Sequence, residues 1–147
     1  TEFSMRFVVR LAVLGLAFVA AAPAARAQGR EVFGRSTATL SPAVKAGGLV
    51  YGSGQLPARG DSTIEAQTTS ALNNVKAAFE QAGTNMNNAV KCTVFLIDLK
   101  DFAGMNSAYS KFWSPENPPP ARSTVVVAAL VSPGAKLEIE CIAAVAR

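Results

Sequence analysis

The sequence predicts an α+β fold in which two helices cover one face of a mixed β-sheet. Three observations lead to this prediction. Apolar residues recur at helical spacing over residues 71–82 and again over 102–113. Runs rich in β-branched residues occupy 90–97 and 123–131, as is typical of strands. From 137 to 141 apolar and acidic side chains alternate, which predicts a strand with one buried face.

Two strand candidates precede the first predicted helix. Residues 31–40 form a weak candidate, and a Gly47-Gly48 turn introduces a short strand at 49–53. Residues 56–62 predict a loop, because Pro, Gly and Asp accumulate there.

The first helix has the clearest local signals. Ser62 and Glu65 fit a capping box, in which two side chains satisfy free N–H groups at a helix start. Gly83 supplies the left-handed residue at which such a helix ends. Between them the apolar positions form a helical stripe, which consists of Ala71, Leu72, Val75, Ala78, Phe79 and Ala82.

A second helix follows the strand at 90–97. Asp98 and Asp101 are both suited to begin it, because a carboxylate can accept the free N–H groups of a first turn. Proline cannot continue a helix, so Pro115 and the prolines at 118–120 end it. Its apolar side chains are Phe102, Met105, Tyr109, Phe112 and Trp113.

Two strands close the chain. They occupy 123–131 and 136–145, and Pro133-Gly134 forms the turn between them. The complete order is β-β-α-β-α-β-β, and no repeat or low-complexity linker interrupts it. We therefore expect one domain over residues 28–147.

The N-terminal segment has the layout of a secretory signal peptide. Basic residues at 6 and 10 precede an apolar run over 11–22, and Ala25 and Ala27 are the small residues that a signal peptidase reads. A membrane anchor is the alternative, but a spanning helix needs ~20 apolar residues. We expect 5–27 to be removed after Ala27, which places the protein in the periplasm or outside the cell without a membrane span. Residues 1–4 precede the first Met and are expected to lie outside the fold.

Composition excludes several classes of chemistry. The chain has no histidine, so it lacks a Ser-His-Asp or Cys-His relay and any His-based zinc site. Neither a GxxxxGK[ST] motif nor a GxGxxG motif after a strand is present. Without residues 1–27 the net charge falls from +4 to about +2, and basic residues are dispersed, so nucleic acid is not an expected partner.

Two cysteines leave two interpretations open. Cys92 and Cys141 both lie in apolar, strand-like segments. In an oxidising compartment they can form a disulfide, and otherwise they are small buried apolar side chains.

Four features carry candidate chemistry. Gly54 lies in a glycine-rich segment after a strand, which suits close approach of a ligand or simply a turn. Arg122 follows three prolines and is suited to grip a carboxylate through two parallel bonds, with a surface ion pair as the alternative. Glu140 interrupts an apolar strand and is either a base or a residue of a solvated face. Asn106 and Tyr109, one turn apart, either reach a common site or pack locally.

Gly54, Arg122 and Glu140 stand within segments that together resemble the RidA/YjgF family. The segment 40–57 is similar to the family's N-terminal hairpin, and 73–83 to its first helix. Residues 90–102 match its next strand and turn, and 120–124 and 137–143 match its two closing segments. The motifs occur in the right order over nearly the whole of the predicted domain, which makes the resemblance specific.

The resemblance implies a chorismate-mutase-like α+β fold, a homotrimer, and ligand sites in clefts between subunits. It implies hydrolysis of reactive enamines and imines, such as 2-aminoacrylate and 2-iminobutanoate, to 2-keto acids and ammonia. The expected ligands are small imino-acid and keto-acid carboxylates. No metal or organic cofactor is implied.

The resemblance also implies roles for individual residues. Arg122 would bind the substrate carboxylate, and Glu140 would position or activate a water. Gly54, with Ser53 beside it, would offer backbone contacts, and Asn106 would lie near the site.

Two positions depart from the family pattern. Leu40 stands where active members commonly carry an aromatic residue, and Thr124 stands at a pocket position that is often Cys. Both departures reshape the expected pocket. Two further functions therefore stand beside the deaminase: a non-catalytic trimeric module that binds small carboxylates, and the endoribonuclease or translation-inhibitor activity ascribed to some members.

Overall fold

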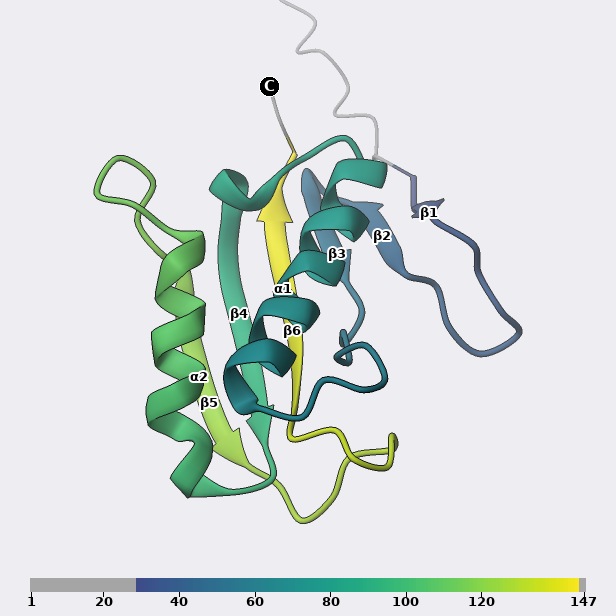
Figure 1. The fold of residues 1–147 in the computed structure, drawn as a ribbon. Helices are drawn as coiled ribbons and strands as arrows, with labels where there is room; N and C mark the ends of the chain where they lie inside the picture. The colour runs from purple at the N-terminus through teal and green to yellow at the C-terminus, as the bar shows by residue number, and fades with distance from the viewer. Residues whose placement is uncertain (1–28, 146–147) are drawn as a thin grey trace, which may run out of the picture.

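Six strands form one mixed sheet in the computed structural model, which describes residues 29–145 (Figure 1). The sheet order is β1-β2-β3-β6-β4-β5. Only β4 and β5 are parallel among the neighbouring pairs, and the segment between them contains a helix, as a parallel crossover requires. The strands are β1 (Glu31–Phe33), β2 (Ala43–Ala46), β3 (Leu49–Gly52), β4 (Ala89–Leu96), β5 (Ala121–Val126) and β6 (Leu137–Ala144).

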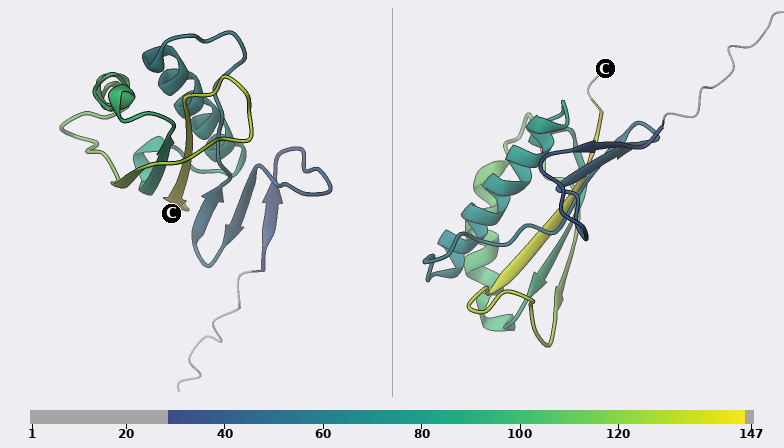
Figure 2. Two further views of the ribbon diagram at one scale, coloured as in Figure 1. Left: turned by 90° about the horizontal axis from the view of Figure 1, so that it is seen from below. Right: turned by 90° about the vertical axis from the view of Figure 1, so that its right-hand side faces the viewer.

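Two helices, α1 and α2, cover one face of this sheet, which confirms the predicted fold class (Figure 2). α1 spans Ile64–Gln81 and begins at Thr63, whose side chain accepts a hydrogen bond from the N–H of Ala66. The cap is thus one residue later than the predicted Ser62. Gly83 has φ +77°, and it follows the helix as predicted.

Apolar residues that recur at helical spacing form the face of α1 that meets the sheet. They make up the core together with the inward side chains of the strands. Every member of the predicted apolar stripe is buried. The buried residues of α1 are Ile64, Gln67, Thr68, Ala71, Leu72, Val75, Ala78 and Phe79.

The second helix, α2, spans Phe102–Tyr109 and continues as a 3-10 turn over Ser110–Phe112. Asp98 caps the preceding 3-10 turn by accepting from the N–H of Lys100, whereas Asp101 makes no such bond to α2. Both carboxylates therefore stand at the entry to the helix, but only one of them caps a turn.

The strand prediction needs three corrections. The candidate at 31–40 is reduced to Glu31–Phe33. The additional strand Ala43–Ala46 forms because it pairs with β1 and β3, so three strands rather than two precede α1. β5 ends at Val126 rather than at residue 131, because its neighbour β4 ends at Leu96 and no further strand lies beside it.

The second face of the sheet carries no helix of the described chain (Figure 2). Successive side chains of a strand point to opposite faces of the sheet, so the residues that alternate with the buried ones project from this second face. It mixes polar groups, such as Lys91 and Glu140, with exposed or half-buried apolar ones, Tyr51, Val125 and Ile142. We refer to it below as the open face.

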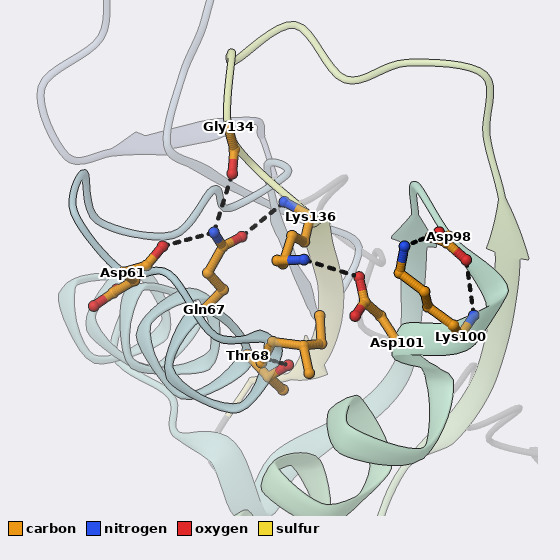
Figure 3. A network of polar contacts seen from close by, with 9 residues as sticks. Asp61, Gln67, Thr68, Asp98, Lys100, Asp101, Gly134 and Lys136 are labelled. Carbon is orange, nitrogen blue, oxygen red and sulfur yellow. Dashed lines mark hydrogen bonds and ion pairs between the residues drawn. The ribbon is translucent and has the colours of Figure 1, made fainter.

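A buried amide fixes the loops at one end of the sheet (Figure 3). The side chain of Gln67 donates to the carbonyls of Asp61 and Gly134 and accepts from the backbone N–H of Lys136. The ammonium of Lys136 in turn lies 3.4 Å from the carboxylate of Asp101. The side chain of Gln67 thereby connects the loop before α1 to the loop before β6. The ion pair between Lys136 and Asp101 connects the loop before β6 to the segment that leads into α2.

Cys92 and Cys141 form a disulfide that joins β4 to β6. They are direct partners in the antiparallel register, with 4.1 Å between their Cα atoms, and both are buried. Of the two interpretations left open by the sequence, the structure thus contains the disulfide.

The predicted signal peptide and residues 1–4 lie outside the described residues. Between residues 29 and 145, no helix is long and apolar enough to cross a membrane.

Candidate functional site

A cavity of about 720 Å³ opens next to Arg122, at the C-terminal end of α2. The proline-rich segment that leads into β5 also lines it. Its lining residues are Asn106, Tyr109, Ser110, Trp113, Ser114, Pro115, Pro118, Pro119, Pro120 and Arg122. Proline rings restrict the backbone that delivers Arg122 to the sheet, so its position is defined before any ligand arrives.

Three contacts orient the half-buried guanidinium of Arg122. One nitrogen donates to Oδ1 of Asn106 at 2.7 Å, and another lies 3.8 Å from the sulfur of Met105. The guanidinium carbon sits 4.6 Å from the centre of the Tyr109 ring, a cation–π geometry. These contacts use only part of the five N–H donors of Arg122, so the remainder is available to an anion. The structure thereby brings two sequence-predicted site residues, Arg122 and Asn106, together.

Two aromatic side chains, Tyr109 and Trp113, line the cavity. The rings of Tyr109 and Trp113 are 5.7 Å apart and tilted by 43°. Burial raises the pKa of Tyr109 to about 12, although the charge of Arg122 acts in the opposite direction. Tyr109 is therefore a neutral phenol at physiological pH. Its hydroxyl and the indole N–H of Trp113 are both buried without a hydrogen-bond partner among the described residues.

Thr124 lies on the same side of β5 as Arg122, because side chains two residues apart in a strand share a face. Its hydroxyl is buried and has no hydrogen-bond partner within the described chain. Thr124 does not line the cavity, so the structure places it near Arg122 but not in the wall beside it.

Glu140 lies on the opposite face of the sheet. Its neighbour Cys141 is buried under the helices, so Glu140 itself projects from the open face, where it is exposed. There it lines a smaller hollow of about 250 Å³ with Tyr51, Lys91 and Thr93. Arg122 and Glu140 therefore do not share a cavity within one chain.

Ser53 and Gly54 follow β3 and lie toward the open face. A Cβ atom at Gly54 would collide with the carboxylate of Glu138, so a larger residue at this position would displace the Glu138 side chain. The hydroxyl of Ser53 donates to the carbonyl of Ser41 at 2.7 Å. Gly54 thus lies beside the Glu138 side chain of β6 and does not line the cavity that contains Arg122.

Sequence reasoning missed the contribution of Trp113 and the prolines. The sequence predicts Trp113 as part of the apolar stripe of the second helix, and it does pack partly against the core. The sequence does contain a signal for this wall. Trp113 stands five residues before the run of three prolines, and Arg122 stands two residues after that run. Leu40, where an aromatic was expected, is 53% exposed in the loop before β2 and lines no cavity described here.

The described residues contain no group of three or more His, Cys, Asp or Glu side chains that is arranged to hold a metal ion. The groups described above are a positioned guanidinium, two aromatic side chains and, on the other face, a carboxylate.

Comparison with known proteins gives consistent matches. The sequence profile described as endoribonuclease L-PSP matches residues 34–145. The mitochondrial protein mmf1 of Schizosaccharomyces pombe is 40% identical over 114 residues, covering 74% of this chain and 69% of that protein. A RutC family protein of Haemophilus influenzae is 44% identical over 119 residues, covering 74% of this chain and 91% of that protein.

Solved structures agree with these matches. A YjgF family protein of Neisseria meningitidis superposes with a TM-score of 0.76 at 26% identity, covering 82% of this chain and 98% of that one. TdcF of E. coli with bound serine superposes with a TM-score of 0.71 at 34% identity, covering 79% and 99%. The chain therefore belongs to the endoribonuclease L-PSP family, the RidA/YjgF family that its sequence motifs resemble.

Proposed function

We propose that the protein hydrolyses reactive imines and enamines of 2-amino acids to 2-keto acids and ammonia. The observation that carries the proposal is the guanidinium of Arg122, which Asn106 and Tyr109 hold at the wall of the largest cavity described. Membership of the family supports it. The serine bound to the E. coli relative, an amino acid with a carboxylate, supports small-molecule binding in this fold.

The reaction needs little from the protein beyond positioning. Water adds to the carbon of the C=N bond, and the nitrogen takes up a proton. The resulting carbinolamine expels ammonia and leaves a C=O bond, while an enamine first takes a proton at its β-carbon to become the imine. Because the imine carbon is already electrophilic, a fixed carboxylate and an oriented water can lower the barrier by several kcal/mol, ~7–11 at best. A site without histidine is compatible with this chemistry.

The second proposed group, Glu140, has to come from another copy of the chain. Arg122 lies on the helix-covered side of the sheet and Glu140 on the open face, so one protomer cannot place both around one substrate. The open face carries Tyr51 and Val125, which are 43% and 44% exposed, and an oligomer would bury them. We propose a homotrimer in which Arg122 of one protomer and Glu140 of its neighbour form each site.

Mixed trimers test this arrangement directly. Arg122→Ala and Glu140→Gln chains, carrying different tags, are co-expressed and purified through both tags. In a ring of three, each mixed trimer then contains one site with both groups intact, so activity of about one third of the wild type is expected. Each variant alone is expected to be inactive.

Turnover is measured with imines that an L-amino-acid oxidase generates in the presence of semicarbazide. An active protein suppresses formation of the semicarbazone. Mixed trimers without activity would contradict the shared site, whereas activity of the Glu140→Gln homotrimer would remove Glu140 from the mechanism. A wild type that binds 2-keto acids through Arg122 but turns over no imine would instead be the carboxylate-binding module.

Export of the protein is a separate proposal. Cleavage after Ala27 would deliver it to the periplasm or the medium. The Cys92–Cys141 disulfide supports this, because such bonds persist in oxidising compartments and are rare in the cytosol. Expressed with its own N-terminus in a bacterial host, the protein is expected in the periplasmic fraction as a chain that begins at Gln28. Intact-mass measurement of that fraction checks the prediction, and a cytosolic chain retaining residues 5–27 would contradict it.

A further inference from the structure

We propose that the cavity beside Arg122 selects ligands with a branched or bulky apolar side chain, and that Trp113 determines this selectivity. The inference rests on the proposed use of Arg122 as the carboxylate anchor. It goes beyond the proposed reaction because it names the class of 2-imino and 2-keto acids that the site takes.

Most of the lining of the cavity beside the anchor is apolar, and its uncharged polar members are Asn106, Ser110 and Ser114. Two aromatic rings and the rings of four prolines line the cavity, and Arg122 is the only charged residue among its lining residues. Its volume of about 720 Å³ falls within the ~300–1,000 Å³ typical of pockets for drug-sized ligands. A short side chain would leave most of this apolar surface in contact with water, which is unfavourable.

The two aromatic rings follow one another in space, starting from Arg122. Tyr109 stacks on the guanidinium at 4.6 Å, and Trp113 follows at 5.7 Å from Tyr109. Tyr109 thus supports the anchor, and Trp113 stands one step further along the same wall. A carboxylate on Arg122 directs the rest of its molecule along this wall, so Trp113 meets the ligand's side chain rather than its carboxylate.

Trp113 is also the only tryptophan in the sequence, so the intrinsic tryptophan fluorescence reports this position alone. The probes are two stable keto acids, 4-methyl-2-oxopentanoate with a branched side chain and 2-oxobutanoate with a short one. The branched acid is expected to change the emission and to bind about tenfold more tightly, because its additional carbons become buried.

Variants assign the preference to Trp113. By calorimetry, Trp113→Leu is expected to reduce the preference to about twofold by weakening the branched acid while leaving 2-oxobutanoate nearly unchanged. Trp113→Phe is expected to retain part of it and guards against a folding defect of the first variant. Phe112→Leu is the matched control, because Phe112 neighbours Trp113 but lines a different hollow.

Three outcomes would overturn the inference: equal affinity for the two acids, no binding of either, or a preference that Trp113→Leu leaves undiminished. These outcomes are separate from failure of the proposed reaction. A wild type that prefers the branched acid but hydrolyses no imine would sustain the selectivity and reject the deaminase. A wild type that hydrolyses short and branched imines at equal kcat/KM, and binds the two keto acids with equal affinity, would sustain the deaminase and reject the selectivity.

Discussion

Arg122→Lys is expected to lower kcat/KM for imino acids by about 100-fold, equivalent to about 3 kcal/mol of lost binding to the reacting state. Lysine keeps the positive charge but cannot offer two parallel N–H groups to a carboxylate. It also loses the guanidinium's cation–π contact with Tyr109 and its directed bond to Asn106. Charge alone therefore does not replace the geometry.

Semicarbazone suppression measures the loss, and Arg59→Lys is the matched control, since Arg59 is exposed in the loop before α1. Thermal unfolding of both variants should resemble that of the wild type, because Arg122 is only half-buried. Full activity of Arg122→Lys would show that no two-point carboxylate contact forms at this residue.

Loss of the Cys92–Cys141 disulfide is expected to lower the free energy of unfolding by about 4 kcal/mol. The bond links residues 49 positions apart, and closing a loop of this length removes that much chain entropy from the unfolded state. The bond joins two central strands, so the effect is expected on the whole domain rather than on one edge.

Denaturant unfolding with and without a reductant measures the difference. The Cys92→Ala/Cys141→Ala variant is the control and should show no dependence on reductant. Alkylation of the unfolded wild type, followed by mass measurement, reports the thiols independently. Two reactive thiols before reduction, together with equal stability in both conditions, would contradict the disulfide.

Local signals predicted the parts of the fold that depend on neighbouring residues. The stripe from Ala71 to Ala82 and the glycine after it specify α1 within the chain itself, since i and i+4 side chains share a face. The observed cap, Thr63, lies one residue after the predicted cap, Ser62, because both side chains offer the same hydroxyl.

Strand boundaries depended on partners that the local sequence does not show. Ala43–Ala46 contains only four residues, two of them alanine, and becomes a strand because β1 and β3 pair with it on both sides. Residues 127–131 are apolar and prolong the predicted strand, but only the N–H of Val127 still reaches β4, where it donates to the carbonyl of Leu96. Residues 128–131 lie beyond the end of β4 and lack the partner that a strand requires.

The same division holds for the candidate site. The sequence identified Arg122, Asn106 and Glu140 as candidates, because guanidinium, amide and carboxylate groups carry the needed chemistry and occur in recognisable motifs. It could not show that Arg122 and Glu140 project from opposite faces. That result depends on strand register, in which Cys92 stands opposite Cys141 and beside Arg122.

By itself, the sequence determined the fold class, the long helix, the family and the chemical identity of the anchor, because these follow from side-chain types and their spacing. Only the tertiary structure decided the disulfide, the aromatic wall at Trp113 and the separation of Arg122 from Glu140. The physical reason is the period of two along a strand: a shift of register by one residue exchanges the faces, and long-range pairing alone sets that register.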